Sequence, residues 1–310
     1  MSYLFLAAGL ALLVIGGDIL VRGAVTLAAR LGVSPLLVGL TVVGFGTSTP
    51  ELVTSLDAAF SGAPGIAIGN VVGSNIANIL LILGAAAVIA PVTVETRAFR
   101  RDGTALALAS LAALAVVLLG SLSRPAGALL LAGLIAYVAT AYWLEKRAVP
   151  AEASAPEDQQ GGLARPALLA LLGIAVTILG ARLLVGAATE LAQAWGVSDT
   201  VIGLTVVAVG TSLPELVTAL VAAFRRQGDI AFGNVVGSNI YNILGILGVT
   251  ALVHPLPVPA EIVAFDIWMM LAATGALALA TFTGGRVSRA EGTAMLGAYA
   301  AYTGWLALAA

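Results

Sequence analysis

The stretches GLTVVGFGTSTPELVTSL (residues 39–56) and GLTVVAVGTSLPELVTAL (residues 203–220) are nearly identical. Each one places a single glutamate, Glu51 or Glu215, inside an apolar segment, and an offset of 164 residues relates the two. Roughly two-thirds of the positions match between residues 38–84 and 202–248, far more than shared apolar composition produces. The sequence therefore predicts a duplicated chain with one buried carboxylate in each copy.

The composition is that of a membrane protein. Of the 310 residues 60% are hydrophobic and 10% are charged, and the mean hydropathy is +1.06. Soluble domains carry about 25% charged residues. Apolar runs of about 18 to 25 residues, long enough to cross a bilayer as helices, recur along the whole chain. We expect an all-α integral membrane protein with ten transmembrane helices, at residues 3–29, 35–60, 66–90, 103–121, 126–145, 166–192, 199–224, 230–253, 261–283 and 290–309.

The basic residues predict the orientation. If loops alternate sides, eleven of the fourteen lie on one side and only Arg124 on the other, while Arg22 and Arg182 fall within helices. By the positive-inside rule both termini then face outward, from a multi-pass protein of the cell inner membrane. The polar segment 147–164 becomes a flexible cytoplasmic linker between a first five-helix repeat, 1–146, and a second, 165–310. Because five is odd, the second repeat enters the membrane from the opposite side, which is typical of secondary transporters.

The repeated motif predicts a broken helix with exposed oxygens. Pro50 lacks an N–H and its ring obstructs the carbonyl of Gly46, so we expect the second helix to break at Pro50 and the seventh at Pro214. The freed carbonyls are expected near Gly44 and Ala208, and such backbone is tolerated in a membrane only where it is buried or lines a cavity. Hydroxyl and carboxylate side chains share a helical face in both copies, from Thr47, Ser48 and Glu51, and from Thr211, Ser212 and Glu215.

The helix after each motif supplies further oxygens. Ser74 and Asn78 are four residues apart on one stripe, and Ser238 and Asn242 repeat the arrangement. Carboxylates, hydroxyls, amides and carbonyls are hard ligands that suit Ca2+, and Na+ competes for the same oxygens. The motifs contain no His or Cys, which argues against Zn2+ or Cu+.

Each singled-out residue also has a purely structural interpretation. A lone proline would be only a kink, but a glutamate and a proline recurring in register argue for a site. Packing alone is the alternative for Ser74 and Ser238. We expect four further asparagines to cap or bridge neighbouring helices instead of touching an ion: Asn70, Asn75, Asn234 and Asn239. Asp57 has no acidic counterpart, since residue 221 is valine.

The paired motifs GTSTPEL (46–52) with GNVVGSNIAN (69–78), and GTSLPEL (210–216) with GNVVGSNIYN (233–242), resemble the two alpha repeats of the calcium/cation antiporter superfamily, and in particular its prokaryotic sodium/calcium exchangers. The resemblance covers the whole ten-helix layout. It implies an antiporter in which entering Na+ drives Ca2+ out. By position, Glu51 and Glu215 with carbonyls near Thr47 and Thr211 would hold Ca2+. Flanking Na+ sites would use Thr47, Ser48, Ser74, Thr211, Ser212 and Ser238, with Asn78 in the centre.

The sequence departs from the resemblance at one position. Many prokaryotic and potassium-dependent relatives carry Asp where this chain has Asn242, so Glu51 and Glu215 alone give the site a charge of at most −2. One Ca2+ would neutralise that charge, whereas Na+ in every site would leave a net positive charge in a poorly solvating cavity. This favours alternating occupancy by the two ions and weakens the case for K+ co-transport.

Outside the motifs, Asp18 and Arg182 are also 164 residues apart. We expect Asp18 to pair with Arg182 or with Arg22 one turn along, as part of a gate; the alternative is separate snorkelling to the interfaces. A proton-coupled exchanger and a cation channel are the competing functions, while the absence of a nucleophile–base pair argues against an enzyme. We expect no cofactor, nucleic acid or required protein partner: the partners are Ca2+, Na+ and the lipid bilayer.

Overall fold

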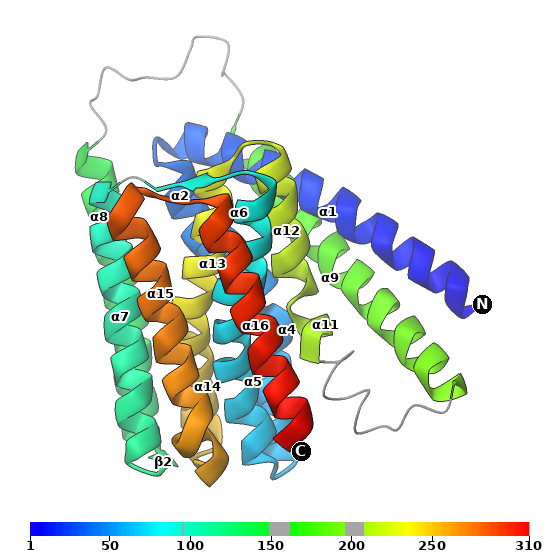
Figure 1. The fold of residues 1–310 in the computed structure, drawn as a ribbon. Coiled ribbons are helices and arrows are strands. Elements are labelled where there is room, and N and C mark those ends of the chain that lie inside the picture. Colours follow the sequence, from blue (N-terminus) through cyan, green and yellow to red (C-terminus); the bar gives the residue numbers. More distant parts are fainter. Residues whose placement is uncertain (95, 149–161, 196–207, 310) are drawn as a thin grey trace.

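The computed structural model describes residues 1–94, 96–148, 162–195 and 208–309 (Figure 1). In the first half the helices are α1 (Ser2–Leu31), α2 (Pro35–Val38), α3 (Gly44–Thr47), α4 (Thr49–Phe60), α5 (Pro64–Ala77), α6 (Gly84–Ile89), α7 (Thr96–Leu118) and α8 (Arg124–Ala148). In the second half they are α9 (Ala164–Ala194), α11 (Ala208–Thr211), α12 (Leu213–Phe224), α13 (Gly228–Ile240), α14 (Leu247–Val253), α15 (Ile267–Gly284) and α16 (Arg289–Ala309). The expected linker, 147–164, falls largely on residues 149–161, outside the described residues.

Short π-helical segments join several of these helices. They are η1 (Gly39–Val43), η2 (Asn78–Leu83), η4 (Tyr241–Ile246) and η5 (Ile262–Asp266). Segments η2 and η4 interrupt equivalent long helices, and they hold Asn78 and Asn242, two of the residues expected to bind ions. π-Helical turns within α-helices are frequent at functional sites. The hydrophobic pattern of the sequence does not distinguish these segments from α-helix.

The chain is a multi-span membrane protein. Seven described helices are long and apolar enough to cross a membrane, or eight if the bent pair Pro35–Thr47 and Thr49–Phe60 counts as one span. The expected seventh helix, 199–224, lies partly outside the described residues, so the count of ten spans remains a prediction. Two candidate spans have the largest share of buried residues within an 18-residue apolar window: 83% for Gly228–Val253 and 72% for Pro64–Ile89. These two spans therefore form the centre of the bundle.

The helix breaks lie two residues before the prolines, which corrects the expectation of breaks at Pro50 and Pro214. The first helix segment ends at Ser48 (φ −79°, ψ 11°) with a bend of 42°, and the equivalent residue Ser212 (φ −89°, ψ 7°) ends α11. Pro50 and Pro214 lie in the first turns of α4 and α12. Proline is well tolerated there, because the N–H that it lacks has no partner within the helix and its fixed φ suits a helix start. The prolines thus start new helices and do not kink old ones.

Contacts between the two halves follow the 164-residue offset. Strand β1 (Val92–Thr93) pairs antiparallel with β4 (Arg286–Val287), and β2 (Ser121–Leu122) pairs with β3 (Leu256–Pro257). Adding 164 to the residues of β1 gives β3, and adding it to β2 gives β4 to within one residue. Each small sheet therefore takes one strand from each half, and the two sheets are equivalent under the duplication.

Helices α1 and α9 form an antiparallel pair that lies beside the rest of the bundle (Figure 1). Glycines spaced seven residues apart bring their backbones together. A Cβ atom on Gly16 would lie 2.6 Å from the Thr177 backbone nitrogen, and one on Gly180 would lie 2.6 Å from that of Leu13. Only glycine fits at such distances. We call this contact the glycine seam; its members are Gly9, Gly16, Gly23, Gly173 and Gly180.

Candidate ion-binding site

Two glutamates lie at the centre of the bundle, each in the first turn of a helix that follows a break. Glu51 begins α4 and Glu215 begins α12, and each is only 1% exposed. The sequence places them there because Ser48 and Ser212 end the preceding helices and the prolines allow new helices to start. The positive end of a helix dipole favours a carboxylate in the first turn.

Hydrogen bonds from the break residues cross between the two halves. Ser48 Oγ donates to Glu215 Oε1 at 2.8 Å, and Ser212 Oγ donates to Glu51 Oε1 at 3.1 Å. The spacing within each motif predicts that each serine shares a helical face with the glutamate of its own motif. The breaks instead let each serine reach the glutamate of the other half, which joins the two motifs into one site.

Each carboxylate keeps one oxygen without a partner. Glu51 Oε2 and Glu215 Oε2 are buried and accept no hydrogen bond, and the ion pairs of the described residues include neither glutamate. Burial of an unpaired charge is costly unless a counter-charge is supplied. The described residues contain no group of three His, Cys, Asp or Glu side chains that could hold a metal ion, so these two carboxylates supply the site's acidic oxygens.

Two equivalent asparagines hold the backbone of the glutamates, as expected for bridging residues. Asn70 Nδ2 on α5 donates to the Glu51 carbonyl at 3.0 Å, and Asn234 Nδ2 on α13 donates to the Glu215 carbonyl at 3.1 Å. The Asn234 Oδ1 atom also lies 3.2 Å from the Thr47 hydroxyl, so it links α13 to the first motif. These contacts fix the position of both helix starts relative to the central helices.

Amide side chains form a second layer beside the carboxylates. Asn78 Nδ2 donates to Asn239 Oδ1 at 2.9 Å, and Asn239 Nδ2 donates to the Asn75 carbonyl at 3.3 Å. The Asn78 Oδ1 atom and both side-chain polar atoms of Asn242 are buried without partners. The amide layer is therefore asymmetric, and it leaves further neutral oxygens unused.

The remaining expected ligands are only partly brought together. Thr47 and Ser238 are fully buried and Ser74 is 6% exposed. The Gly44 carbonyl is not free as expected: it accepts from the Ser48 backbone N–H at 3.2 Å and from Ser238 Oγ at 3.1 Å. The reason is that the helix continues to Ser48 before it breaks. The side chain of Thr211 lies close to Glu51, and Ala208 begins α11.

The expected ion pair between Asp18 and Arg22 is present, with Arg22 Nε 2.9 Å from Asp18 Oδ2, but Asp18 does not pair with Arg182. The register of the glycine seam explains why. Residue 16 faces residue 177 and residue 13 faces residue 180, so Arg182 lies about seven residues along the helix from the level of Asp18. At 1.5 Å per residue that is about 10 Å along the helix. The second partner of Asp18 is Arg225, directly after α12, which the sequence analysis did not identify.

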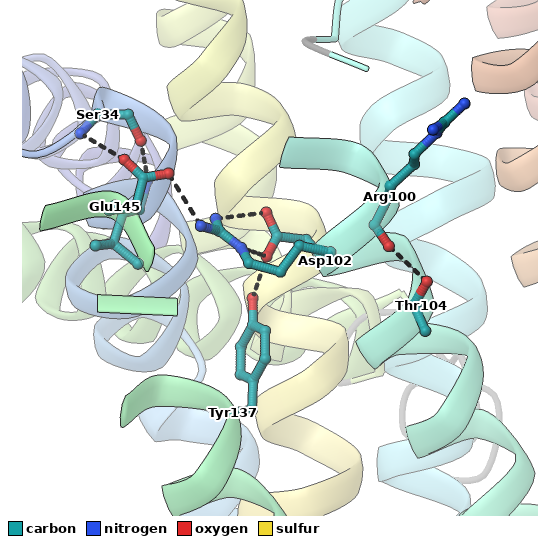
Figure 2. Close-up of polar contacts among 8 residues, drawn as sticks. Ser34, Arg100, Asp102, Thr104, Tyr137 and Glu145 are labelled. Carbon is teal, nitrogen blue, oxygen red and sulfur yellow. Dashed lines mark hydrogen bonds and ion pairs between the residues drawn. The ribbon is translucent and has the colours of Figure 1, made fainter. Parts of the chain in front are cut away.

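A polar cluster away from the glutamates was not predicted from the sequence (Figure 2). Asp102 on α7 is fully buried and forms two contacts with Arg101, at 2.7 and 2.9 Å, and it accepts a hydrogen bond from Tyr137 on α8 at 3.1 Å. Arg101 also contacts Glu145, which accepts from the Ser34 backbone N–H before α2. The signal was available, since residue 266, at the same offset of 164, is also aspartate and accepts from a tyrosine, Tyr302, at 3.0 Å.

Comparison with known proteins connects this geometry to a family. The model of the sodium/calcium exchanger protein family matches residues 1–143 and 166–308. The chain belongs to the sodium/calcium exchanger family. This is a family of exchangers and not of catalytic enzymes, and its match extends over both halves of the chain, each with its glutamate motif.

Individual relatives match over nearly the full length. The present chain is 38% identical over 308 residues to the putative antiporter CaxA of Alkalimonas amylolytica, and the match covers 96% of each chain. It is 36% identical to the sodium/calcium exchanger MaX1 of Methanosarcina acetivorans, covering 97% of each. The structure of the sodium-calcium exchanger NCX_Mj soaked without Na+ or Ca2+ superposes with a TM-score of 0.85 at 33% identity, covering 98% of each chain.

Proposed function

We propose that this chain exchanges Na+ for Ca2+ across the cell inner membrane by alternating access, with the ions bound between the two halves. One observation carries the proposal: two buried carboxylates from equivalent motifs face a common centre, and each has an oxygen without a partner. A divalent cation would neutralise both charges. The relatives named as a sodium/calcium exchanger and a putative antiporter support the same function.

The oxygens suit a hard cation. Glu51 Oε2 and Glu215 Oε2 are acidic, while Asn78 Oδ1 and Asn242 Oδ1 are neutral, and all four are buried. Ca2+ accepts six to eight oxygens in a flexible arrangement, and Na+ suits the same kind of ligand. In this proposal the serine hydroxyls turn toward the ions, because a hydroxyl can donate to a carboxylate or present its lone pairs to a cation.

Ten transmembrane helices in two inverted five-helix repeats are part of the proposal. The equivalent breaks at Ser48 and Ser212, and the two strand pairs that exchange one strand between halves, support a pseudo-two-fold relation. Secondary transporters with inverted repeats bind their substrates at the midplane, where discontinuous helices meet. The position of YrbG, an inner membrane protein of Escherichia coli that is 40% identical over 259 residues, supports the cellular location.

Flux into sealed vesicles tests this function. Purified protein is reconstituted with internal Na+, and uptake of radioactive Ca2+ is measured after dilution into Na+-free buffer. We expect uptake that requires the outward Na+ gradient. Uptake driven by a pH gradient alone would make the chain a proton-coupled exchanger, and uptake without any counter-gradient would make it a channel; either result contradicts the proposal.

A further inference from the structure

The side of α12 that continues beyond the site is covered by α1. A Cβ atom on Gly17 would lie 3.3 Å from Val217 Cγ1 and 3.4 Å from Val221 Cγ2, which shows how closely the helices approach. The next residue, Asp18, forms an ion pair with Arg225 at the end of α12. Asp18, Val221 and Arg225 line one cavity of about 500 Å³ between the two helices.

The equivalent side of α4 is not covered in the same way. The residue equivalent to Val217 is Val53, whose side chain is 42% exposed. Among the described residues, α1 packs closely on α12, but α9 does not pack on α4. Residue 182, equivalent to Asp18, is an exposed arginine that forms no ion pair among the described residues. The two halves are thus equivalent in sequence but differ in which face is covered.

The duplication predicts what would happen if the two halves exchanged conformations. The contact of residue 17 with residue 221 would become a contact of residue 181 with residue 57, and residue 57 is Asp57, also exposed here. Arg182 follows residue 181 directly, so its guanidinium would come within reach of the Asp57 carboxylate. The acid and the base are reversed between the halves: the acid is on α1 and the base beyond α12, whereas the base is on α9 and the acid is on α4.

We propose that Asp57 and Arg182 form an ion pair in the alternate conformation of the antiporter. Asp57 is equivalent to Val221, which lines the same cavity as Asp18 here, and the residue equivalent to Arg225 is Ser61, one turn further along. The inference rests on the proposed function, because it needs a chain that alternates between two arrangements. The Asp18–Arg225 pair holds α1 against α12, and the Asp57–Arg182 pair would hold α9 against α4. Exposed ion pairs are weak, so each pair shifts the balance of conformations without locking either one.

The predicted topology places the two pairs at opposite faces of the membrane. With both termini outside, α4 ends at the outer face and α12 ends at the inner face. The Asp18–Arg225 pair then fastens α1 over the cytoplasmic side of the site, and the Asp57–Arg182 pair would fasten α9 over the outer side. The single negative charge of Asp57, which has valine as its counterpart, thereby acquires a role.

Cysteine cross-linking tests the proposal, because the chain contains no native cysteine. Three double variants are compared in vesicles with a short thiol cross-linker: Asp18→Cys with Arg225→Cys, Asp57→Cys with Arg182→Cys, and the control Asp57→Cys with Arg225→Cys, whose positions lie at opposite faces. We expect the first two pairs to cross-link and the control to react at least tenfold more slowly.

A further substitution links the two contacts. Arg225→Gln removes the ion pair with Asp18, so it should raise the rate of cross-linking between positions 57 and 182 by several-fold. Failure of positions 57 and 182 to react above the control, in protein whose 18 and 225 positions react, would overturn the proposal. Since cross-linking is read on a gel and needs no ion gradient, this failure is distinguishable from an absence of Na+/Ca2+ exchange in the flux assay.

Discussion

The serine and asparagine hydrogen bonds to Glu51 and Glu215 are repeated in the two halves of the chain, whereas the contacts of Asp102 and its equivalent Asp266 differ. The Ser48–Glu215 bond is mirrored by Ser212–Glu51. Asp102 is fully buried with Arg101 and Tyr137, but its equivalent, Asp266, is only half-buried and has a tyrosine, Tyr302, among its contacts without an arginine. A site reached from both sides of a membrane must present similar chemistry to each side. Asp102 and Asp266 lie away from the site and do not have to meet this requirement. We therefore expect their different contacts to affect the stability of the fold and not the binding of ions.

Removing a carboxylate from the ion-binding site should have the greatest consequence. Glu51→Gln and Glu215→Gln should each reduce Na+-dependent Ca2+ uptake at least a hundredfold, because each removes half of the charge that neutralises the cation. Glu190→Gln is the control, since Glu190 lies on the exposed side of α9 near the chain start, where it accepts from Ser2. Initial rates in vesicles measure the effect. A variant that keeps wild-type uptake would remove that glutamate from the site.

The next prediction tests the difference between the Asp102 cluster and Asp266. Arg101→Met leaves Asp102 buried without its cation, and breaking a buried ion pair on one side costs about 3–5 kcal/mol. Tyr302→Phe removes one hydrogen bond from the half-buried Asp266 and should cost about 1 kcal/mol. Thermal unfolding of the detergent-solubilised variants, followed by tryptophan fluorescence, compares them. Equal destabilisation would show that the two clusters are equivalent after all.

A smaller effect concerns the glycine seam. Gly16→Ala places a methyl group 2.6 Å from the Thr177 backbone nitrogen, so the helices must separate. Overpacking of this kind costs about 1–3 kcal/mol. The matched control is Gly275→Ala on α15, where the added Cβ meets no described atom within 4 Å and alanine favours the helix. The same unfolding measurement should show a lower midpoint for the first variant only; an unchanged midpoint contradicts the close approach.

The last prediction concerns the crossing serines Ser48 and Ser212. Ser48→Ala and Ser212→Ala each remove one hydrogen bond to a carboxylate, which is worth about 1.5–3 kcal/mol. The Ca2+ concentration for half-maximal uptake should therefore change by about tenfold or more, and by a similar factor in both variants. Thr26→Ala, on the exposed side of α1, is the control. Strongly unequal effects would mean that the two halves bind the ions differently.

Much of this architecture was predictable from the duplication. The helix bounds agree within a few residues at most ends, although α7 begins seven residues before the expected start at residue 103. The central position of Glu51 and Glu215 follows from apolar surroundings and a repeated motif. The crossing of the serine bonds did not follow, because it depends on breaks at Ser48 and Ser212, and the sequence pointed to the prolines.

The differences at Asp18 have one physical cause: the contacts depend on the relative height of helices that are distant in sequence. The seam register keeps Arg182 away from Asp18, and only the packing of α1 on α12 brings Arg225 to that residue. Asp102 lay in a segment expected to be a loop before the fourth helix, so its burial was not anticipated. Periodicity within one helix carries no information on these heights. The 164-residue offset does carry some, since it pairs Asp102 with Asp266.

The two small sheets have a consequence for synthesis of the chain. Strand β1 precedes α7 and strand β2 follows it, yet the partners of both lie after residue 255. When the ribosome has completed the first half, both strands still have unpaired backbone groups at the ends of inserted helices. The two sheets can therefore form only after the last quarter of the chain has been synthesised, and until then the first half lies in the bilayer with these strands unpaired.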